Sequence, residues 1–245
     1  MKRKSSDDAG ATLNKTPKLS VIPSFNSVKD ALDFLYESFP SFNFKQPIRP
    51  IIVKSQLYAL VHNRTAVDAN LNALQNSSEI RLLKLEDQVD DSVAIMRAVD
   101  YRKSFEDISP NEDERILFQK FCDLVIDKNR HLTVVKQTLS NYFTDKEISL
   151  LVQCGALTIR SPGCWWISAP SAGRFLTAYR NGQDAILRIL RRKRFKELLL
   201  SDIVNRDLGK KIVLGASYHV LAHIGAGTLI SVPTSSGPLV RLRTG

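Results

Sequence analysis

Apolar residues along the first third of the chain repeat with two different periods, and each change of period separates one element from the next. Apolar side chains recur three or four positions apart over 27–39, 54–61 and 65–75, which predicts three helices. Apolar and polar residues alternate over 79–85, EIRLLKL, and strands are also expected at 51–53 and 92–98. The expected order is a helix, a short strand, two helices and a two-stranded hairpin.

The same order of elements returns twice. In the second stretch we expect helices at 112–126, 132–143 and 145–154, and strands at 156–160 and 164–168. In the third we expect one or two helices over 172–192, interrupted near Asn181-Gly182, helices at 195–204 and 215–224, and strands at 228–232 and 239–242. A helix-turn-helix with an appended hairpin is the order of a winged helix, so the repetition predicts a tandem array.

These patterns predict a mainly α fold with small β-hairpins, an α+β class, organised as three tandem winged-helix domains. We expect the domains at 25–108, 109–169 and 170–245. Residues 1–24 precede them and form an expected disordered basic tail, because the segment is rich in Lys, Ser, Thr and Asp. A chain of 245 residues, 43% of them hydrophobic, is long and apolar enough for several small domains.

The net charge of +10 is concentrated at the ends of the chain. Residues 170–245 hold thirteen lysines and arginines against four acidic residues, whereas residues 21–169 hold seventeen basic and nineteen acidic residues. This asymmetry predicts an anionic partner that meets the C-terminal third. We expect the nearly neutral stretch 27–168 mainly to bind proteins or the other units.

One stretch, QDAILRILRRKRFKELLL at 183–200, combines a helical period of apolar residues with a high density of positive charge. Arg188, Arg191 and Arg192 fall within an arc of roughly 100°, opposite the apolar residues of the same helix. Lys193 and Arg194 turn toward the apolar side, so the helix is expected to end near them. A phosphate backbone is the usual partner of such a cationic ridge, and a solvated helix face is the alternative.

Two further features of the third unit are candidates for nucleic-acid contacts. The helix at 215–224 occupies the recognition-helix position, where Ser217 and Tyr218 are expected to reach a groove. It has no Arg, Asn or Gln for a bidentate base contact, so we expect little sequence preference. In the turn at 233–237, Ser235 and Ser236 offer hydroxyls to phosphates, although an ordinary hairpin turn explains them equally well.

Other chemistries find little support. His219 and His223 are four residues apart without a third ligand nearby, and the three cysteines form no C-x-x-C, so we expect neither a metal nor a cofactor. Of Trp165 and Trp166, one is expected to fill the core and the other an inter-domain contact. The chain has no GxGxxG, HRD or DFG, and Met96 follows Val93-Ala94-Ile95 where a kinase requires lysine. No apolar run is long enough for a membrane span.

Several runs of residues resemble the eukaryotic family called serine/threonine-protein kinase 19, also termed winged-helix repair factor. They are IIVKSQLYALV followed by RT in the first unit, then GALTIR, WW, AGRF, KELLLSDI, LGASYHV and TSSGPLVRL. The resemblance covers about residues 25–245. It implies three winged helices, no kinase activity, and nucleic-acid binding in the nucleus during transcription-coupled nucleotide excision repair. It also implies that the protein bridges the stalled RNA polymerase II assembly and TFIIH on DNA.

The resemblance also implies particular DNA-binding residues. Family positions match Arg64 in the first unit and Arg191 and Arg206 in the third. A further basic position corresponds to Thr177 here, and Arg180 lies close enough to replace it. The candidate contacts are Arg64, Arg180, Arg188, Arg191, Arg192, Lys193, Arg194, Arg206, Ser235 and Ser236. Double-stranded DNA is the expected partner; RNA and a homodimer stay open, as do an adaptor without DNA binding and a kinase.

Overall fold

The computed structural model describes residues 19–84, 93–206 and 212–243. The first unit comprises α1 (Val28–Glu37), a 3-10 turn η1 (Ser41–Asn43), β1 (Ile52–Val53), α2 (Lys54–Leu60), α3 (Arg64–Asn76), β2 (Ile80–Lys84) and β3 (Val93–Arg97). Its sheet has the order β1-β3-β2, with both pairs antiparallel. These elements agree with the periodicity of 27–98. Residues 85–92, between β2 and β3, lie outside the described residues.

The second unit follows α4 (Ala98–Glu106). It comprises α5 (Glu112–Phe121), a π-helical turn η2 (Cys122–Ile126), β4 (Thr133–Val135), α6 (Lys136–Ser140), α7 (Asp145–Gln153), β5 (Leu157–Ser161) and β6 (Cys164–Ile167). The third unit comprises α8 (Ala172–Arg191), β7 (Glu197–Leu199), α9 (Leu200–Val204), α10 (Gly215–Gly225), β8 (Leu229–Val232) and β9 (Leu239–Leu242). Their sheets, β4-β6-β5 and β7-β9-β8, repeat the strand order of the first.

Local side-chain chemistry accounts for where several helices begin. Asn63 precedes α3 and its side-chain oxygen accepts a hydrogen bond from the Ala66 amide at 3.0 Å. Thr144 and Glu147 form a reciprocal capping box at the start of α7. Such caps satisfy amides that have no partner within the helix, and each stabilises a helix by about 1 kcal/mol.

The structure differs from the expected elements in four places. In place of the helices expected at 132–143 and 195–204, the chain first forms a short strand, β4 or β7, and then a short helix. Each of these strands pairs with the second strand of the hairpin in its unit, β4 with β6 and β7 with β9. The helix α4 was not predicted. The interruption expected near Asn181-Gly182 is absent, because α8 runs without a break for 20 residues. Gly182 instead allows a close approach: a Cβ added there would lie 1.9 Å from Nε2 of His219.

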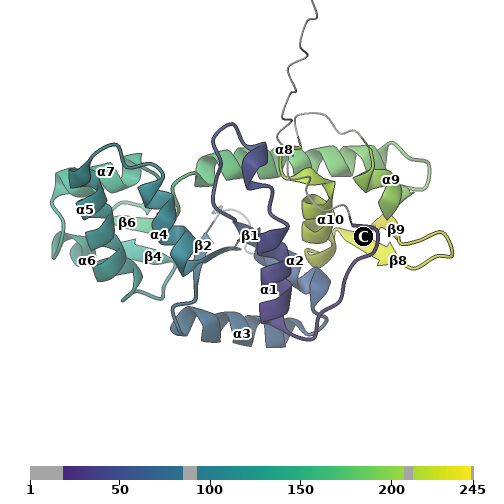
Figure 1. The fold of residues 1–245 in the computed structure, drawn as a ribbon, viewed down its shortest axis with the longest axis horizontal. Helices are drawn as coiled ribbons and strands as arrows, with labels where there is room; N and C mark the ends of the chain where they lie inside the picture. Colours follow the sequence, from purple (N-terminus) through teal and green to yellow (C-terminus); the bar gives the residue numbers. More distant parts are fainter. Residues whose placement is uncertain (1–18, 85–92, 207–211, 244–245) are drawn as a thin grey trace, which may run out of the picture.

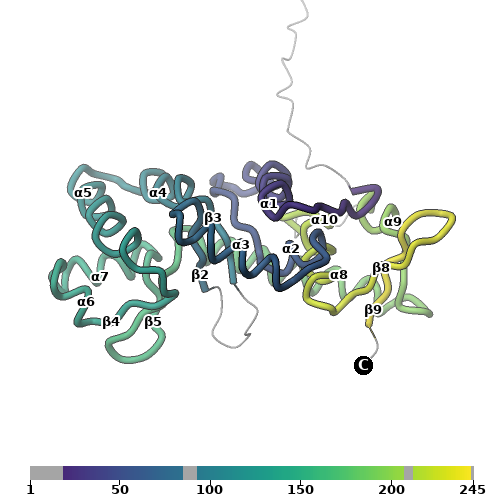
Figure 2. The backbone as a smooth tube through the Cα atoms, turned by 90° about the horizontal axis from the view of Figure 1, so that it is seen from below, coloured from purple at the N-terminus to yellow at the C-terminus, as the bar shows by residue number. Residues whose placement is uncertain are grey.

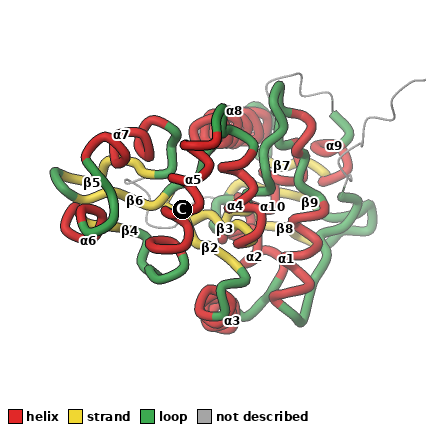
Figure 3. The backbone as a smooth tube through the Cα atoms, turned by 60° about the vertical axis from the view of Figure 1, so that its left-hand side comes forward, coloured by secondary structure: helices red, strands yellow, loops and turns green. Residues whose placement is uncertain are grey.

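The spatial order of the units differs from their order along the chain. Figure 1 shows the second unit at the left, the first in the middle and the third at the right, with α8 running across the top. A helix of 20 residues spans about 30 Å, so α8 carries the chain from the second unit back across the first. Figure 3 shows the three small sheets apart from one another, each accompanied by its own helices.

A buried arginine joins the first and second units. Arg81 of β2 is 2% exposed, and its guanidinium donates hydrogen bonds to the carbonyls of Ile126, Asn129 and His131. These carbonyls lie in and after the turn η2, where a helix end leaves acceptors without internal partners. Burial removes water from the Arg81 guanidinium and lowers its pKa, which is unfavourable for the charged form. The hydrogen bonds to the three carbonyls offset this free-energy cost.

The helix α10 joins the first and third units and is buried on both sides. Tyr218, Leu221 and Ala222 belong to a core shared with the first and second units, whereas Val220 belongs to the core of the third unit. Figures 1 and 2 show α10 beside α2 and α8 in two perpendicular views. The contact with α2 is closest at Gly225, where an added Cβ would stand 1.6 Å from the Ser55 carbonyl oxygen.

Candidate nucleic-acid interface

The helix α8 separates an apolar face from a cationic one, as its sequence predicts. Its buried residues are Ala172, Phe175, Ala178, Gly182, Ile186 and Leu190. Arg188 and Arg191 lie exposed in its last turn, and the helix ends at Arg191 with Arg192 as its C-cap. Burial of the apolar face holds the helix against the third unit, so the arginines are displayed on a rigid support.

Beyond the helix the chain stays cationic and tightly turned. Lys193, Arg194 and Lys196 are all exposed, and together with Arg188, Arg191 and Arg192 they form the cationic segment, residues 188–196. The Lys196 amide donates to the Lys193 carbonyl at 3.0 Å, and the Leu242 amide donates to the Lys196 carbonyl at 3.0 Å. These bonds tie the segment to β9, so its cations have a fixed relationship to the sheet.

The electrostatics of this segment favour an external anion. Among the described residues, no ion pair involves Arg188, Arg191, Arg192 or Lys193. The C-terminal end of α8 carries a partial negative charge that stabilises Arg188 and Arg191 and by itself repels phosphate. Six cations outweigh this partial charge. The adjacent carboxylate of Glu197 is already paired with Arg241, whose Nε lies 2.6 Å from Oε2.

The structure places the other candidate residues of the third unit apart from this segment. The turn with Ser235 and Ser236 is exposed, and Thr234 Oγ1 donates to the Gly237 carbonyl at 2.5 Å. The pairing runs from Glu197 with Arg241 to Leu199 with Leu239, so this turn lies at the opposite end of the β7–β9 ladder from the cationic segment. Such a ladder is about 10 Å long. Arg206 is exposed two residues after α9.

Arg64 and Arg180 also lie apart from the cationic segment. Arg64 begins α3, where its Nη2 donates to the Gly225 carbonyl at 2.9 Å and its guanidinium lies 4.9 Å from the Tyr58 ring centroid. It therefore bridges the first unit to the end of α10. Arg180 is exposed on α8, about 12 Å along the helix axis from Arg188. Thr177 donates its hydroxyl to the Gly173 carbonyl at 3.0 Å.

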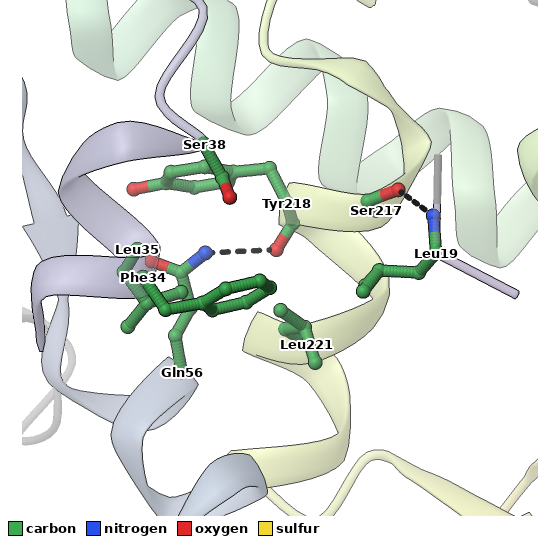
Figure 4. A pocket seen from close by; sticks show the side chains of 8 residues that line it. All are labelled: Leu19, Phe34, Leu35, Ser38, Gln56, Ser217, Tyr218 and Leu221. Atoms are coloured by element: carbon green, nitrogen blue, oxygen red, sulfur yellow. Dashed lines mark hydrogen bonds between the residues drawn. The ribbon is translucent and has the colours of Figure 1, made fainter. Parts of the chain in front are cut away.

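The expectation that Ser217 and Tyr218 reach a DNA groove is wrong, because α10 is buried. Tyr218 is 6% exposed and its hydroxyl donates to the Ile51 carbonyl at 2.8 Å. Figure 4 shows the backbone carbonyl of Tyr218 accepting from Gln56 Nε2, and Ser217 Oγ accepting from the Leu19 amide. The small pocket around them lies between α1, α2 and α10 and is lined mostly by apolar side chains.

The helices at the same position in the other units are not cationic. On α3 the charged residues are Arg64 and Asp68, and on α7 they are Asp145, Lys146 and Glu147. Tyr58 donates to Asp68, and Glu147 serves the α7 cap. A phosphate backbone would meet little positive charge on either helix, which agrees with the nearly neutral composition of 27–168.

The histidine pair serves packing. His219 is 0% exposed, neither of its ring nitrogens has a hydrogen-bond partner, and burial lowers its pKa to about 3. His223 is 6% exposed, with Nε2 placed 3.3 Å from the Gln183 carbonyl, and burial lowers its pKa. Within the described residues no group of three or more His, Cys, Asp or Glu side chains is placed to hold a metal ion.

The tryptophans separate as the alternation of a strand predicts. Trp165 packs against the core beside Val134 of β4, which confirms its expected place. Trp166 faces the other side of the sheet, where the Arg160 guanidinium lies 4.5 Å from its ring centroid. None of the helices in the described part of the chain is long and apolar enough to cross a membrane.

The sequence-based candidates omit two exposed cations, one inside the cationic segment and one close to it. Lys196 is the last residue of the segment and has a left-handed backbone at φ 54°, and Arg243 follows β9. Arg243 belongs to a strand pattern, and only the pairing of β7 with β9 brings the end of β9 beside residue 196. The run RRKRFK itself is the signal by which Lys196 could have been found.

Comparison with known proteins places this chain in a family. Residues 29–242 match the family described as "Inactive serine-threonine protein kinase 19". The chain is 36% identical over 214 residues to "Winged helix repair factor 1" of Xenopus laevis, covering 86% of this chain and 82% of that protein. It is 34% identical over 218 residues to the protein of the same name from Homo sapiens, covering 88% and 85%.

A more distant match carries a kinase name. The chain is 25% identical over 124 residues to "Serine/threonine-protein kinase mug51" of Schizosaccharomyces pombe, covering 46% of this chain and 40% of that protein. The family match and the two longer matches span nearly all of the described units. The chain therefore belongs to the family of inactive serine-threonine protein kinase 19, whose members include proteins named winged helix repair factor 1.

Proposed function

We propose that this protein is a non-enzymatic nuclear factor that binds double-stranded DNA during DNA repair, and that its three units are tandem winged-helix domains. The observation that carries the proposal is the cationic segment, whose six exposed side chains extend from a helix packed on its opposite face. The family supports the repair role through relatives that are named repair factors. The identical strand order of the three sheets supports the domain assignment.

The proposed binding is directed at the phosphate backbone. Arginines and lysines on a helix end reach phosphates, which carry no base information. The buried helix α10 cannot enter a major groove without separating from α2 and α8. Arg206 and the turn with Ser235 and Ser236 extend the proposed DNA path across the third unit. The family resemblance is the reason for including Arg64 and Arg180 in this path. RNA duplexes present the same backbone charge and are a second candidate ligand.

A finer proposal is that the protein acts in transcription-coupled nucleotide excision repair, between the stalled RNA polymerase II assembly and TFIIH. Its support is the family resemblance together with the division of charge along the chain. The first and second units are nearly neutral and are proposed to bind proteins, whereas the basic third unit is proposed to contact DNA. A homodimer is an alternative use of the same nearly neutral units.

The second candidate function is an interaction adaptor without DNA binding. One observation favours it: Ile116, Val135 and Ile159 of the second unit are 58%, 47% and 71% exposed. Exposed apolar side chains of this size are common where another protein binds. A kinase is the weakest alternative, because the family is described as inactive and the chain has no kinase motif.

The proposal is tested by the salt dependence of duplex binding. Four to six phosphate contacts would give a slope of log K against log salt of about −0.9 per contact. We expect Arg191→Glu combined with Arg206→Glu to weaken binding to all duplexes alike and to flatten the slope by about two contacts. Arg115→Glu is the matched control, because Arg115 is equally exposed but lies on the second unit. A well-folded double variant with unchanged affinity would favour the adaptor instead.

A further inference from the structure

A large aromatic side chain is exposed inside the cationic segment. Phe195 is 67% exposed, although Arg194 precedes it and Lys196 follows it. The Arg194 guanidinium lies 5.2 Å from the centroid of its ring. An apolar ring gains nothing from water, and a polar side chain would serve a simple turn equally well. Phe42 is as exposed as Phe195, so the cationic setting of Phe195, and not its exposure alone, points to a ligand.

The backbone around Phe195 holds this ring in a defined place. The amide of Lys193 donates to the Leu190 carbonyl, and the amide of Lys196 donates to the Lys193 carbonyl, both at 3.0 Å. Lys196 then adopts φ 54° and its carbonyl is held by the Leu242 amide. Phe195 thus projects from a closed turn between α8 and β7, so little backbone entropy is lost when its ring meets a ligand.

A shallow open groove lies beside the ring. It is lined by Phe195, Lys196, Glu197, Arg241 and Leu242. Glu197 is the one carboxylate among these five residues, and Arg241 compensates its charge with a contact of 2.6 Å. The surroundings of the ring are therefore positive, because the charges of Glu197 and Arg241 offset each other and the exposed cations of residues 191–196 remain.

An aromatic ring among cations matches the chemistry of an unpaired nucleobase joined to phosphates. Aromatic side chains stack on bases of any sequence, whereas cations hold the adjoining backbone. A closed duplex leaves no free base face along its length, because each base is stacked on both sides. Phe and Arg are also enriched in protein–protein interfaces, but six clustered cations favour a polyanion over a protein surface of mixed charge.

We propose that Phe195 stacks on an unpaired base, so that the cationic segment binds DNA at a boundary between duplex and single strand more tightly than it binds closed duplex. The proposal rests on the proposed DNA binding and specifies its substrate class. The phosphates of the duplex side contact Arg188, Arg191 and Arg192. The first unpaired base lies against the Phe195 ring.

The test compares two DNAs bound by the full chain: a closed duplex, and the same duplex with a central bubble of unpaired thymines. We expect wild-type protein to bind the bubble about fivefold or more tightly than the closed duplex, the lower limit for stacking one base. Phe195→Ala should lower bubble affinity to about that of the closed duplex and so remove this preference. Phe195→Trp should keep the preference, and Phe195→Leu, which is apolar but not aromatic, should lose it.

Phe42→Ala is the matched control, because Phe42 is 70% exposed but lies in η1 of the first unit, and it should change neither affinity. Equal binding of both DNAs by wild-type protein, with affinity that Arg191→Glu lowers, would overturn the stacking proposal and leave DNA binding intact. The ring would then be assigned to a protein contact. Binding of neither DNA would remove the proposed function as well. Retention of the preference in Phe195→Leu would also overturn stacking.

Discussion

Gly182 of α8 lies directly against the imidazole of His219 of α10. A Cβ added to Gly182 would stand 1.9 Å from Nε2 and 2.3 Å from Cε1 of that ring. The ring is fully buried, with Tyr179 and Tyr218 within 6 Å between centroids. The glycine that resembles a helix break in the sequence is thus what allows α8 and α10 to cross closely.

We expect Gly182→Ala to destabilise the protein by about 1–3 kcal/mol, because the added methyl group overpacks this crossing. Gly173→Ala on the same helix is the control, since an added Cβ there meets nothing within 4 Å. That control should be neutral or stabilising by up to about 1 kcal/mol, as alanine favours helices over glycine. Urea unfolding of both variants measures the difference. Equal stability of the two would contradict the close crossing.

The join between the first and second units should depend on Arg81. We expect Arg81→Met to lower the free energy of unfolding by about 2–4 kcal/mol, because three carbonyls at buried or partly buried sites lose a charged donor. Arg130→Met provides the comparison: its Nη2 bonds Asn76 and Ser78 at an exposed site, so its loss should cost about 1 kcal/mol or less. Chemical denaturation measures both. A near-neutral Arg81→Met would show that the carbonyls find water instead.

The buried histidines predict that stability falls in mild acid. The folded-state pKa of His219 is about 3, below its value of 6.5 in an unfolded chain, so the unfolded state binds more protons between these values. The contribution of His219 to the free energy of unfolding is complete above pH 6.5. It is lost as the pH falls below 6.5, by up to about 1.4 kcal/mol per pH unit. His223, whose pKa burial also lowers, contributes with the same sign.

Urea unfolding at pH 7.5 and 5.5, each about one unit from the ordinary histidine pKa, measures this loss of stability. We expect His219→Phe to reduce the loss, because the aromatic volume remains while the titration is removed. The account of His219 would be wrong if wild-type protein and His219→Phe lost the same stability over this interval.

DNA binding should show little sequence preference. In the proposed complex the cationic segment contacts phosphates, which carry no base information. The helix α10 is packed against α2 and α8, where a base-reading helix would need to be exposed. Selection of bound sites from a random duplex library should therefore return no sharp motif. A strong consensus would require α10 to leave its buried position, which hydrogen exchange on α10 in the complex would reveal.

Local patterns along the chain predicted most elements because the periods of helices and strands are local properties. The helices α1, α2, α3 and α7 and all three hairpins lie where their periods place them. The strands β4 and β7 were mistaken for helix starts, since three residues show no clear period and only pairing with the hairpin defines them. The cationic ridge of α8 was also evident, because its apolar and charged faces follow one helical period.

Tertiary structure decided which of these surfaces are exposed and can contact a ligand. The sequence of α10 is apolar on nearly every side, which is the pattern of a buried helix, yet its place in the element order suggested an exposed one. Element order specifies topology within a unit and carries no information on which units pack together. The burial of α10, the crossing at Gly182 and the setting of Phe195 depend on contacts between distant segments, so only the folded chain reveals them.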